Sequence, residues 1–254
     1  MPLIKKIKIL KNKVSITFDK GEKLSIDKDV YTNFYLYEGK QMDKKEYNAL
    51  VSLNNSNQLL QYALKIRSKS LYSEYQMREK LYKKEASKKD VDKVIKYLKQ
   101  YELIDDDAYA YDLMEYYNSL NYGKNKIIHK LSDKGIFIET INKLKFPVSL
   151  EKKKANNILN KLEKKYEKYN YSQKKSHIYN AYLQLGFDND IASEMTNKIK
   201  ESSSKEENEK LKSDYQKVKT RLERKYKGQE LRQKIIQNLM QKGYRLNDII
   251  KVVK

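Results

Sequence analysis

The sequence predicts a mainly α-helical fold, in which tandem three-helix repeats form an elongated curved array behind a small N-terminal β region. Three observations lead to this prediction. Only seven glycines and two prolines interrupt 254 residues, and few breakers favour long helices. Hydrophobic residues make up 39% of the chain, which suits thin layers of helices better than one thick core. A pattern of about 50 residues also recurs along the chain.

The N-terminal region has the alternating pattern of β-strands. The alternating apolar residues are Val14, Ile16 and Phe18 before the turn "DKGE", and Leu24 and Ile26 after it. Because successive side chains of a strand point to opposite faces, this pattern predicts a hairpin with one apolar face. Ile7 and Ile9 predict a third strand before Asn12.

A helix is expected beside this sheet, because a small sheet needs another element to cover its apolar face. The segment with Val30, Phe34 and Leu36 is expected to be that helix and to end at Gly39. Asp43 with Glu46 has the spacing of a capping box, which predicts the start of a second helix.

The helical repeat is defined by an apolar anchor and by its neighbours at fixed spacing. The anchors are Leu81, Leu131, Tyr182 and Leu239. Four residues before them lie Met77, Ile127, Ile178 and Ile235, and four residues after them lie Glu85, Gly135, Gly186 and Gly243. Residues four apart share a face of a helix, and glycine commonly ends one. Each copy is therefore expected to hold three helices, the second ending at this turn.

The copies divide the chain into predicted segments. They are residues 1–56 for the β-hairpin and its helix, then residues 57–105, 106–148, 149–200 and 201–254 for repeats one to four. The stretch "KESSSKEEN" is expected to link the last two repeats, and Ser204 with Glu207 to cap the long helix that follows. Since one triplet buries little surface, neighbouring repeats are expected to stack.

The composition favours a polyanionic partner. The formal charge is +21, from 55 Lys and Arg against 34 Asp and Glu, and such a surplus attracts nucleic acid. The chain has no cysteine, no secretory leader and no apolar run long enough for a membrane span. A cytoplasmic protein without a membrane partner, and a monomer, is therefore expected.

No residue pattern predicts catalysis, so a non-enzymatic protein without cofactor or metal is expected. Asp105, Asp106 and Asp107 stand in a row at a predicted helix start, where capping by Asp106 or Asp107 is favoured over a metal site. His129 and His177 lack partners at metal-ligand spacing, so a helix-surface or boundary position is expected for His129.

The basic stretch after Gly123 is the main candidate contact. Lys124, Lys126 and Lys130 follow a helix start where amides and cations together can hold a phosphate, although a solvated helix face is an equally good interpretation. Tyr122 is the best candidate for stacking on a base, whereas most of the other tyrosines are expected to pack at the core boundary. The corresponding stretches of repeats one and four carry Arg78 and Arg232.

Three consecutive stretches resemble the RecX family of regulatory proteins. They are "SEYQMREKL" from Ser73, "VIKYLKQYELIDDDAYA" from Val94 and "YGKNKIIHKLSDKGI" from Tyr122, in the order of the family's pattern. This chain departs from the pattern in two places. The basic run before the first serine is reduced to Arg67 and Lys69, and Glu85 replaces a glycine.

The resemblance implies a bacterial protein that binds the RecA recombinase filament on single-stranded DNA and modulates, mostly inhibits, its ATPase and strand exchange in the control of DNA repair. Contacts would then come from Arg67, Lys69 and Arg78, from the stretch after Tyr122 and from Arg232, on RecA or on the DNA phosphate backbone. Two alternatives remain open. The chain could be a helical-repeat protein that binds DNA or RNA without RecA, or a nuclease that uses Asp105 to Asp107.

Overall fold

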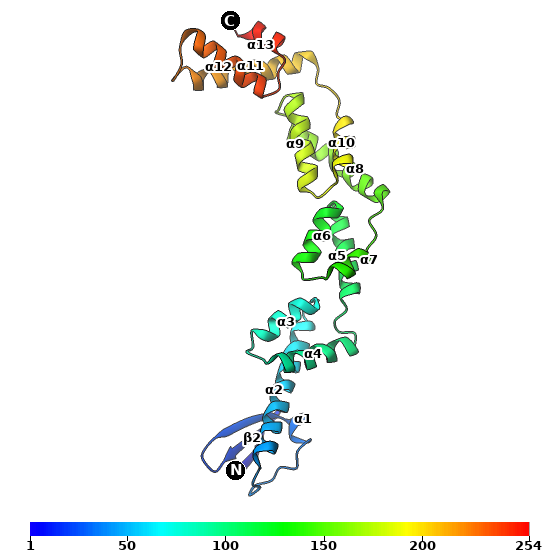
Figure 1. Ribbon diagram of the computed structural model, residues 1–254, viewed down its shortest axis with the longest axis vertical. Helices are drawn as coiled ribbons and strands as arrows, with labels where there is room; N and C mark the ends of the chain where they lie inside the picture. Colours follow the sequence, from blue (N-terminus) through cyan, green and yellow to red (C-terminus); the bar gives the residue numbers. More distant parts are fainter. Residues whose placement is uncertain (254) are drawn as a thin grey trace. The chain divides into compact units, whose positions relative to one another are not determined.

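The computed structural model describes residues 1–253 and consists mainly of helices (Figure 1). It divides into two compact units, Met1–Tyr111 with Ser132–Thr140 and Asp112–Leu131 with Ile141–Lys254. Among residues 1–253, no helix combines the length and the apolar character that a membrane span requires.

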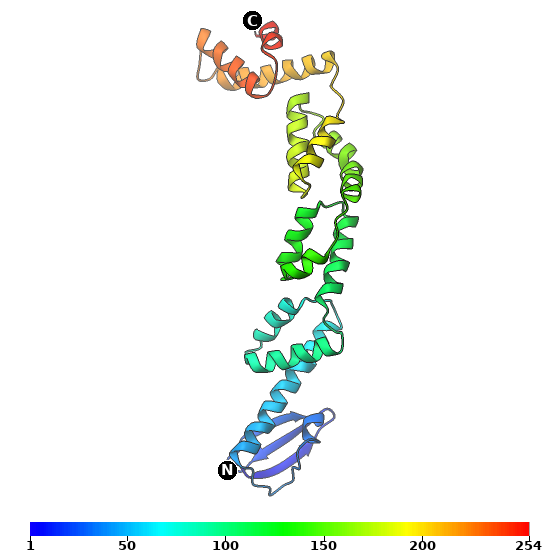
Figure 2. The same cartoon turned by 45° about the vertical axis from the view of Figure 1, so that its right-hand side comes forward.

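The N-terminal sheet confirms the predicted strands. Strands β1 (Ile4–Ile9), β2 (Lys13–Phe18) and β3 (Lys23–Asp27) are antiparallel in the order β1-β2-β3. The alternating apolar residues form the core on one face, with Ile4, Val14, Ile16, Phe18 and Ile26 almost fully buried. Helix α2 (Lys44–Arg67) lies against this sheet (Figure 2) and adds Leu50 to its core.

The prediction of a helix that contains Val30, Phe34 and Leu36 and ends at Gly39 is wrong beyond the first helical turn. Helix α1 covers only Lys28–Tyr31, although Val30 and Leu36 are buried as expected. The hydroxyl of Thr32 and the amide of Asn33 donate to the Asp29 carbonyl, at 2.9 and 2.7 Å. Such side-chain hydrogen bonds compete with a helical ladder, so the chain leaves the helix as a loop.

Helix α2 starts at the predicted cap but is longer than the prediction. The Asp43 carboxylate accepts the Glu46 N–H at 2.7 Å, while the Glu46 carboxylate pairs with Lys40 instead of completing the box. The helix then runs unbroken through the predicted boundary between residues 56 and 57. Its first half packs on the sheet, and its second half places Leu59 and Ala63 in the core of repeat one.

The helices follow the predicted three-helix repeats. After α2 come α3 (Glu74–Tyr82) and α4 (Lys88–Gln100); α5 (Asp106–Ser119), α6 (Lys124–Asp133) and α7 (Ile138–Lys143); α8 (Val148–Lys165), α9 (Tyr171–Gln184) and α10 (Asn189–Asn197); and α11 (Ser204–Leu222), α12 (Gly228–Gln241) and α13 (Leu246–Val252). All four anchors are fully buried, at 0% exposure. The four anchors are thus core positions.

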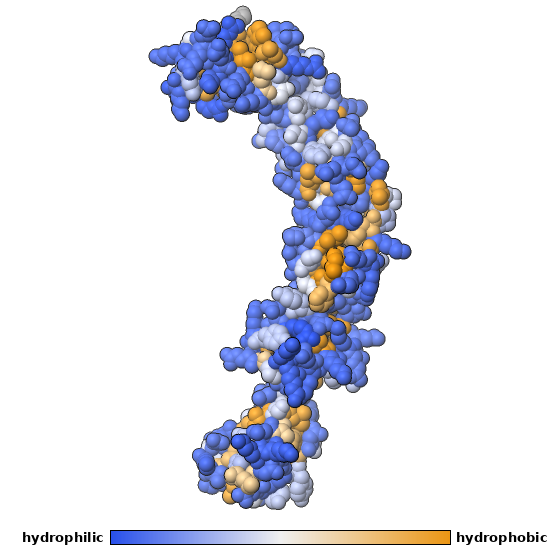
Figure 3. Space-filling model, viewed as in Figure 1, coloured by the Kyte–Doolittle hydropathy of each residue, from blue (hydrophilic) through white to orange (hydrophobic). Residues whose placement is uncertain are grey.

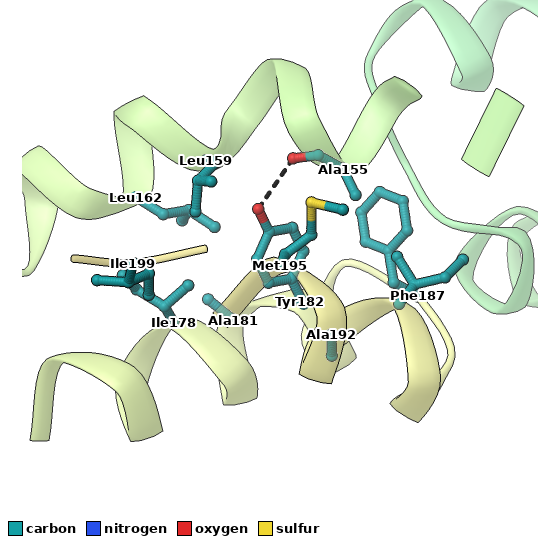
Figure 4. Close-up of a cluster of buried hydrophobic side chains, with 11 residues drawn as sticks. Ala155, Leu159, Leu162, Ile178, Ala181, Tyr182, Phe187, Ala192, Met195 and Ile199 are labelled. Atoms are coloured by element: carbon teal, nitrogen blue, oxygen red, sulfur yellow. Dashed lines mark hydrogen bonds between the residues drawn. The ribbon is translucent and has the colours of Figure 1, made fainter. Parts of the chain in front are cut away.

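The core of repeat three illustrates how one triplet packs. Side chains of α8, α9 and α10 point toward one another around Tyr182, which has Leu159 and Met195 among its neighbours in this cluster (Figure 4). The Tyr182 hydroxyl donates to the Ala155 carbonyl at 2.9 Å. Burial raises the pKa of this phenol, so the hydroxyl stays protonated as a donor.

Neighbouring repeats meet at a junction that occurs three times. At each junction, the turn that ends the middle helix of one repeat packs on the start of the middle helix of the preceding repeat. The carbonyl before the turn glycine accepts a hydrogen bond there: Lys134 from the Ser73 hydroxyl, Leu185 from the Gly123 N–H and Lys242 from the Asn170 amide. The distances are 2.5 to 2.8 Å.

The turn glycines are required by both conformation and space. Gly135, Gly186 and Gly243 have positive φ, and a Cβ atom added to them would lie 2.3 to 2.6 Å from atoms of Tyr75, Lys126 or Ser172. L-residues adopt positive φ at a cost, and such contacts are too short for any real Cβ. The sequence predicted these glycines as helix ends, and the structure adds that they let repeats approach closely.

A carboxylate completes each junction. It comes from the first helix of the following repeat and accepts the first N–H of the middle helix: Asp106 from Glu74, Glu151 from Lys124 and Glu207 from Tyr171, at 2.8 to 3.0 Å. The amides at a helix start lack partners within the helix and carry partial positive charge. Each acid therefore both caps a helix and joins two repeats.

Two capping predictions need correction for this reason. Helix α5 is capped by Asp105, which accepts the Asp107 and Ala108 N–H groups, because Asp106 is used at the junction. Helix α11 is capped by Ser203 with Glu206, one residue earlier than expected, since Glu207 belongs to a junction.

Candidate nucleic-acid interface

Three of the predicted contact residues lie together at α6. The Lys126 ammonium lies 4.5 Å from the centre of the Tyr122 ring, and the Lys130 ammonium lies 5.8 Å from it. Lys130 also lies 5.3 Å from the ring of Tyr117, which stacks on Tyr122 at 6.0 Å. Cations over aromatic faces stabilise such a cluster while keeping their charge available.

The local sequence explains this arrangement. Ile127 and Leu131 are fully buried, so the amphipathic α6 turns its lysines away from the core. Tyr122 directly precedes the helix and reaches the lysines four and eight residues later. Gly123 lets the turn at Gly186 pack against the start of α6, because a Cβ at position 123 would lie 2.3 Å from the Gly186 carbonyl carbon.

The amides at the start of α6 are already bound within the protein. The Lys124 N–H donates to the Glu151 carboxylate at 3.0 Å, and the Asn125 N–H donates to the Gly186 carbonyl at 3.0 Å. A phosphate therefore finds no open helix start at this place. Phosphate contacts of this stretch would come from the side chains of Lys124, Lys126 and Lys130 alone.

A buried ion pair holds the entry to α6 in place. Lys154 and Glu151 are only 2% and 4% exposed, and their charged atoms lie 2.5 Å apart. Lys154 also donates to the Asn118 side chain and to the Tyr122 carbonyl, each at 2.7 Å. Two hydrogen-bond acceptors and the ion pair with Glu151 together compensate the ammonium for the loss of water, so the pair can exist in a dry interior. It ties α5, α6 and α8 together behind the lysines.

Tyr122 is not an open platform for a base. Its side chain is half-buried, and its ring has the Tyr117 ring and the Lys126 ammonium as neighbours. Stacking of a base in the way predicted from sequence would have to displace one of them. The geometry therefore favours Tyr122 as a support for the lysines.

The candidates of repeat one differ in availability. Arg78 is bound by two carboxylates, Glu74 at 2.8 Å and Asp92 at 2.5 Å. Burial acts to lower the pKa of Arg78, but the hydrogen bonds to Asp92 and Glu74 outweigh it and raise that pKa. Arg67 donates to the Leu103 carbonyl at 2.5 Å, whereas the Lys69 side chain is exposed.

Arg232 lies on α12 and is exposed. Its guanidinium makes a long contact of 3.5 Å with the Val253 carbonyl of the same repeat. It stands seven residues before the anchor Leu239, as Lys124 does before Leu131, and it lacks the two carboxylates that bind Arg78. Arg232 is thus the more available arginine.

The histidines lie at the helix surface or boundary. His129 is exposed on α6, as expected. The His177 ring stacks on Tyr166 at 5.3 Å and lies 4.4 Å from the Tyr169 ring.

The three acidic residues of the "DDD" stretch each bind a different group. Asp107 accepts the Thr140 hydroxyl at 2.8 Å, Asp105 caps α5, and Asp106 caps α3.

The fold and the basic α6 cluster define a tandem three-helix-repeat protein with an N-terminal sheet. A regulatory protein RecX from Streptococcus pneumoniae is 30% identical over 260 residues, which cover 99% of this chain and 98% of that protein. A regulatory protein RecX from Lactococcus lactis is 28% identical over 253 residues, covering 97% and 94%. The chain belongs to the RecX family of regulatory proteins. No protein-family model matches it.

Solved structures share the fold. A crystal structure of regulatory protein RecX aligns with a TM-score of 0.64 at 21% identity, covering 78% of this chain and all of the other. A crystal structure of RecX from Lactobacillus salivarius aligns with a TM-score of 0.54 at 22% identity, covering 57% of this chain and 96% of the other.

Proposed function

We propose that this chain binds the RecA filament on single-stranded DNA and modulates, mostly by inhibition, its ATP hydrolysis and strand exchange. The observation that carries the proposal is the relation to RecX proteins along nearly the whole chain, both in sequence and in length. The action is non-enzymatic in this proposal and needs no cofactor or metal.

The α6 cluster supports an electrostatic contact. Lys124, Lys126 and Lys130 are directed away from the core, and the first two amides of the helix, those of Lys124 and Asn125, donate to Glu151 and Gly186. The contact is therefore made by flexible ammonium groups, which suits a phosphate backbone or an acidic protein surface better than one fixed ligand. Arg232 and Lys69 offer further exposed cations on other repeats.

Tandem repeats favour this function physically. Several weak contacts on one chain act together, since each bound repeat raises the effective concentration of the next. A filament presents the same surface again and again, so a repeated binder gains from every subunit that it reaches. No single contact then has to be strong.

The test measures RecA activity directly. Purified chain is added to RecA on single-stranded DNA, and ATP turnover and strand exchange are followed. We expect both to change at or below equimolar protein. Lys124→Glu, Lys126→Glu and Lys130→Glu together should weaken the effect at least tenfold with helicity retained.

A matched control uses three exposed lysines of α11. Lys205→Glu, Lys212→Glu and Lys217→Glu change the net charge by the same amount on another repeat. This variant should keep most of the effect on RecA. Loss of the effect in both variants to the same extent would refute a specific contact at α6.

Direct binding of DNA or RNA without RecA is the second candidate, because the formal charge of +21 suits any polyanion. A gel shift without RecA separates the two. Tight binding with a steep salt dependence, together with no effect on RecA, would favour this candidate over the first.

A further inference from the structure

The outer face of the N-terminal sheet carries a row of lysines. Lys6, Lys8 and Lys23 are exposed on the face opposite the core. Their strand partners fix this placement: Lys6 and Lys23 both pair with Thr17, and Lys8 pairs with Ser15. We call Lys6, Lys8 and Lys23 the lysine face.

A bulge in β1 creates this arrangement. The register shifts between Ile4 and Lys6, so that Ile4 and Ile7 both turn to the core although they are three residues apart. Without the extra residue, the alternation of the strand would bring Lys6 to the core side with Ile4. The sequence "IKKIKI" therefore turns two of its three lysines, Lys6 and Lys8, to the outer face.

Positive charge is in excess around this face, although the Glu38 carboxylate lies at the β1 edge on the Ile7 N–H. Residues 1–28 hold eight lysines and three acids, a surplus of five positive charges. Of the acids, Asp19 and Glu22 lie at the β2–β3 turn, and Asp27 lies opposite Lys13 at the far end of β3. Within residues 1–253, the ammonium groups of the lysine face form no ion pair with a carboxylate.

Two exposed tyrosines lie beside the same sheet. Tyr35 is 84% exposed and Tyr37 is 51% exposed, and their rings contact each other at 5.5 Å. Among the tyrosines of residues 1–253, Tyr35 is the most exposed, whereas Tyr37 is about as exposed as Tyr101 and Tyr116.

The loop that carries these tyrosines is fastened to the edge of β1. The Ile7 N–H donates to the Glu38 carboxylate at 2.8 Å, and the Gly39 N–H donates to the Ile4 carbonyl at 2.8 Å. The Lys40 ammonium donates to the Tyr35 carbonyl at 2.7 Å. The aromatic pair is therefore held next to the strand that carries Lys6 and Lys8.

We propose that the lysine face and the Tyr35–Tyr37 pair bind single-stranded nucleic acid, with lysines on the phosphates and tyrosines on the bases. Lysines two apart on a strand repeat at about 6.6 Å, a spacing comparable to that of neighbouring phosphates in an extended strand. Small hydroxyl side chains between them leave room for the backbone. Rows of cations beside exposed aromatics are typical of single-strand binding, because a duplex offers no free base faces.

This proposal deepens the second candidate function, direct binding of nucleic acid, by placing it on the N-terminal sheet, and it does not rest on the proposed action on RecA. The test therefore omits RecA and measures the fluorescence anisotropy of a labelled oligothymidylate with the full chain over a range of salt concentrations. A failure of the filament assay would leave this measurement unaffected, and the reverse is also true.

The two halves of the surface have different signatures. Lys6→Gln, Lys8→Gln and Lys23→Gln together should lower the slope of log K against log salt by about two, because each lost phosphate contact removes about 0.7. Tyr35→Ala with Tyr37→Ala should weaken binding at least about fivefold and leave that slope unchanged, since stacking releases no counterions.

Helix α4 supplies matched controls for both variants. Lys88, Lys89 and Lys96 are exposed, and Tyr97 and Tyr101 form an exposed ring pair at 4.5 Å. The same substitutions there should change neither the slope nor the affinity by more than about twofold. Equal losses in the α4 and sheet variants, or none in the sheet variants, would overturn the proposal. A loss seen only with a duplex probe would overturn the assignment to single strands.

Discussion

Glu85 occupies, in the first repeat, the position that glycine holds in the other three. It has a φ of +56°, in a region that L-residues adopt at a cost of about 1 to 2 kcal/mol. The glycines of the other three repeats, Gly135, Gly186 and Gly243, lie too close to the preceding repeat for a Cβ atom to fit. A β-sheet, not another triplet, precedes the first repeat, so a side chain is tolerated there.

Gly186→Ala tests the steric part of the junction. Its Cβ would lie 2.3 Å from the Lys126 nitrogen, whereas Gly39, with a similar φ of +90°, has no atom within 4 Å. We expect Gly39→Ala to cost about 1 kcal/mol of unfolding free energy and Gly186→Ala about 1 to 3 kcal/mol more. Urea unfolding measures the loss of unfolding free energy in both variants. Equal losses would mean that the junction shifts enough to accommodate the added Cβ atom.

Helices α3 and α4 are tied by a charged network. Glu74 bonds Arg78 and Lys99, and Arg78 also bonds Asp92. Burial acts to raise the pKa of Glu74, but the hydrogen bonds from Lys99 and Arg78 outweigh it, so that pKa lies below 4.5. The charged carboxylate is therefore favoured in the folded chain.

This network makes stability depend on acid. A carboxyl whose pKa is lowered on folding stabilises the protein fully above its unfolded pKa and loses this contribution as the pH falls through the lowered value. Wild type should therefore exceed Glu74→Gln in stability at pH 7, and the gap should close below about pH 4.5. Urea midpoints measured from pH 7 to pH 3 test this, and a constant gap would contradict it.

Asp106 changes the stability of the folded chain with pH in the opposite direction to Glu74. Burial raises its pKa, although its hydrogen bond from the Glu74 N–H acts against this. Its charge is thus disfavoured in the folded chain, and its contribution to stability improves as the pH falls through the raised pKa. The Glu74 charge also helps to raise the pKa of Asp106, so Glu74→Gln relieves Asp106 as well, and the difference in stability between wild type and Glu74→Gln reports both carboxyls.

Helix α8 stabilises α6 through the buried pair of Glu151 and Lys154. Glu151→Ala leaves a buried ammonium without its carboxylate and the Lys124 N–H without an acceptor, so we expect a loss of about 3 to 5 kcal/mol. Lys152→Ala breaks only the exposed pair with Glu194 and should cost less than about 1 kcal/mol. Thermal unfolding compares the two, and similar costs would contradict the role of the buried pair.

The whole chain carries a formal charge of +21. On the face seen in Figure 3, hydrophilic residues cover most of the surface. The cations are spread over the sheet, over α6 and over α12, while each repeat buries its own small apolar core. Long-range attraction to a polyanion then depends on the sum of these charges.

Salt should therefore weaken the proposed effect on RecA. Because exposed charges are screened over about 10 Å at 0.1 M salt and about 3 Å at 1 M, we expect the amount of protein needed for half-maximal inhibition to rise steeply with salt. RecA activity without the chain, measured at each salt concentration, is the control. A salt-independent effect would indicate an apolar contact instead.

Local patterns were sufficient for much of the candidate site. Tyr122, Lys126 and Lys130 come together because they are four residues apart around one helix, and the i,i+4 pair of Glu74 and Arg78 follows from the same spacing. The ion pair between Arg78 and Asp92 joins two helices, α3 and α4, so local spacing could not predict it. Ile7 and Ile9 predicted a strand, but the bulge between Ile4 and Lys6, and with it the lysine face, depended on pairing with β2.

The sequence by itself determined most of the helices and their repeat, because apolar spacing and turn residues act within a few positions of the chain. The family followed from the resemblance of three stretches to RecX proteins. Only the tertiary structure decided which acid caps which helix. Asp106, Glu151 and Glu207 each bind an amide about 30 residues away in the preceding repeat. A carboxylate at a helix start can cap its own helix or a neighbouring one, and the packing of repeats chooses between them.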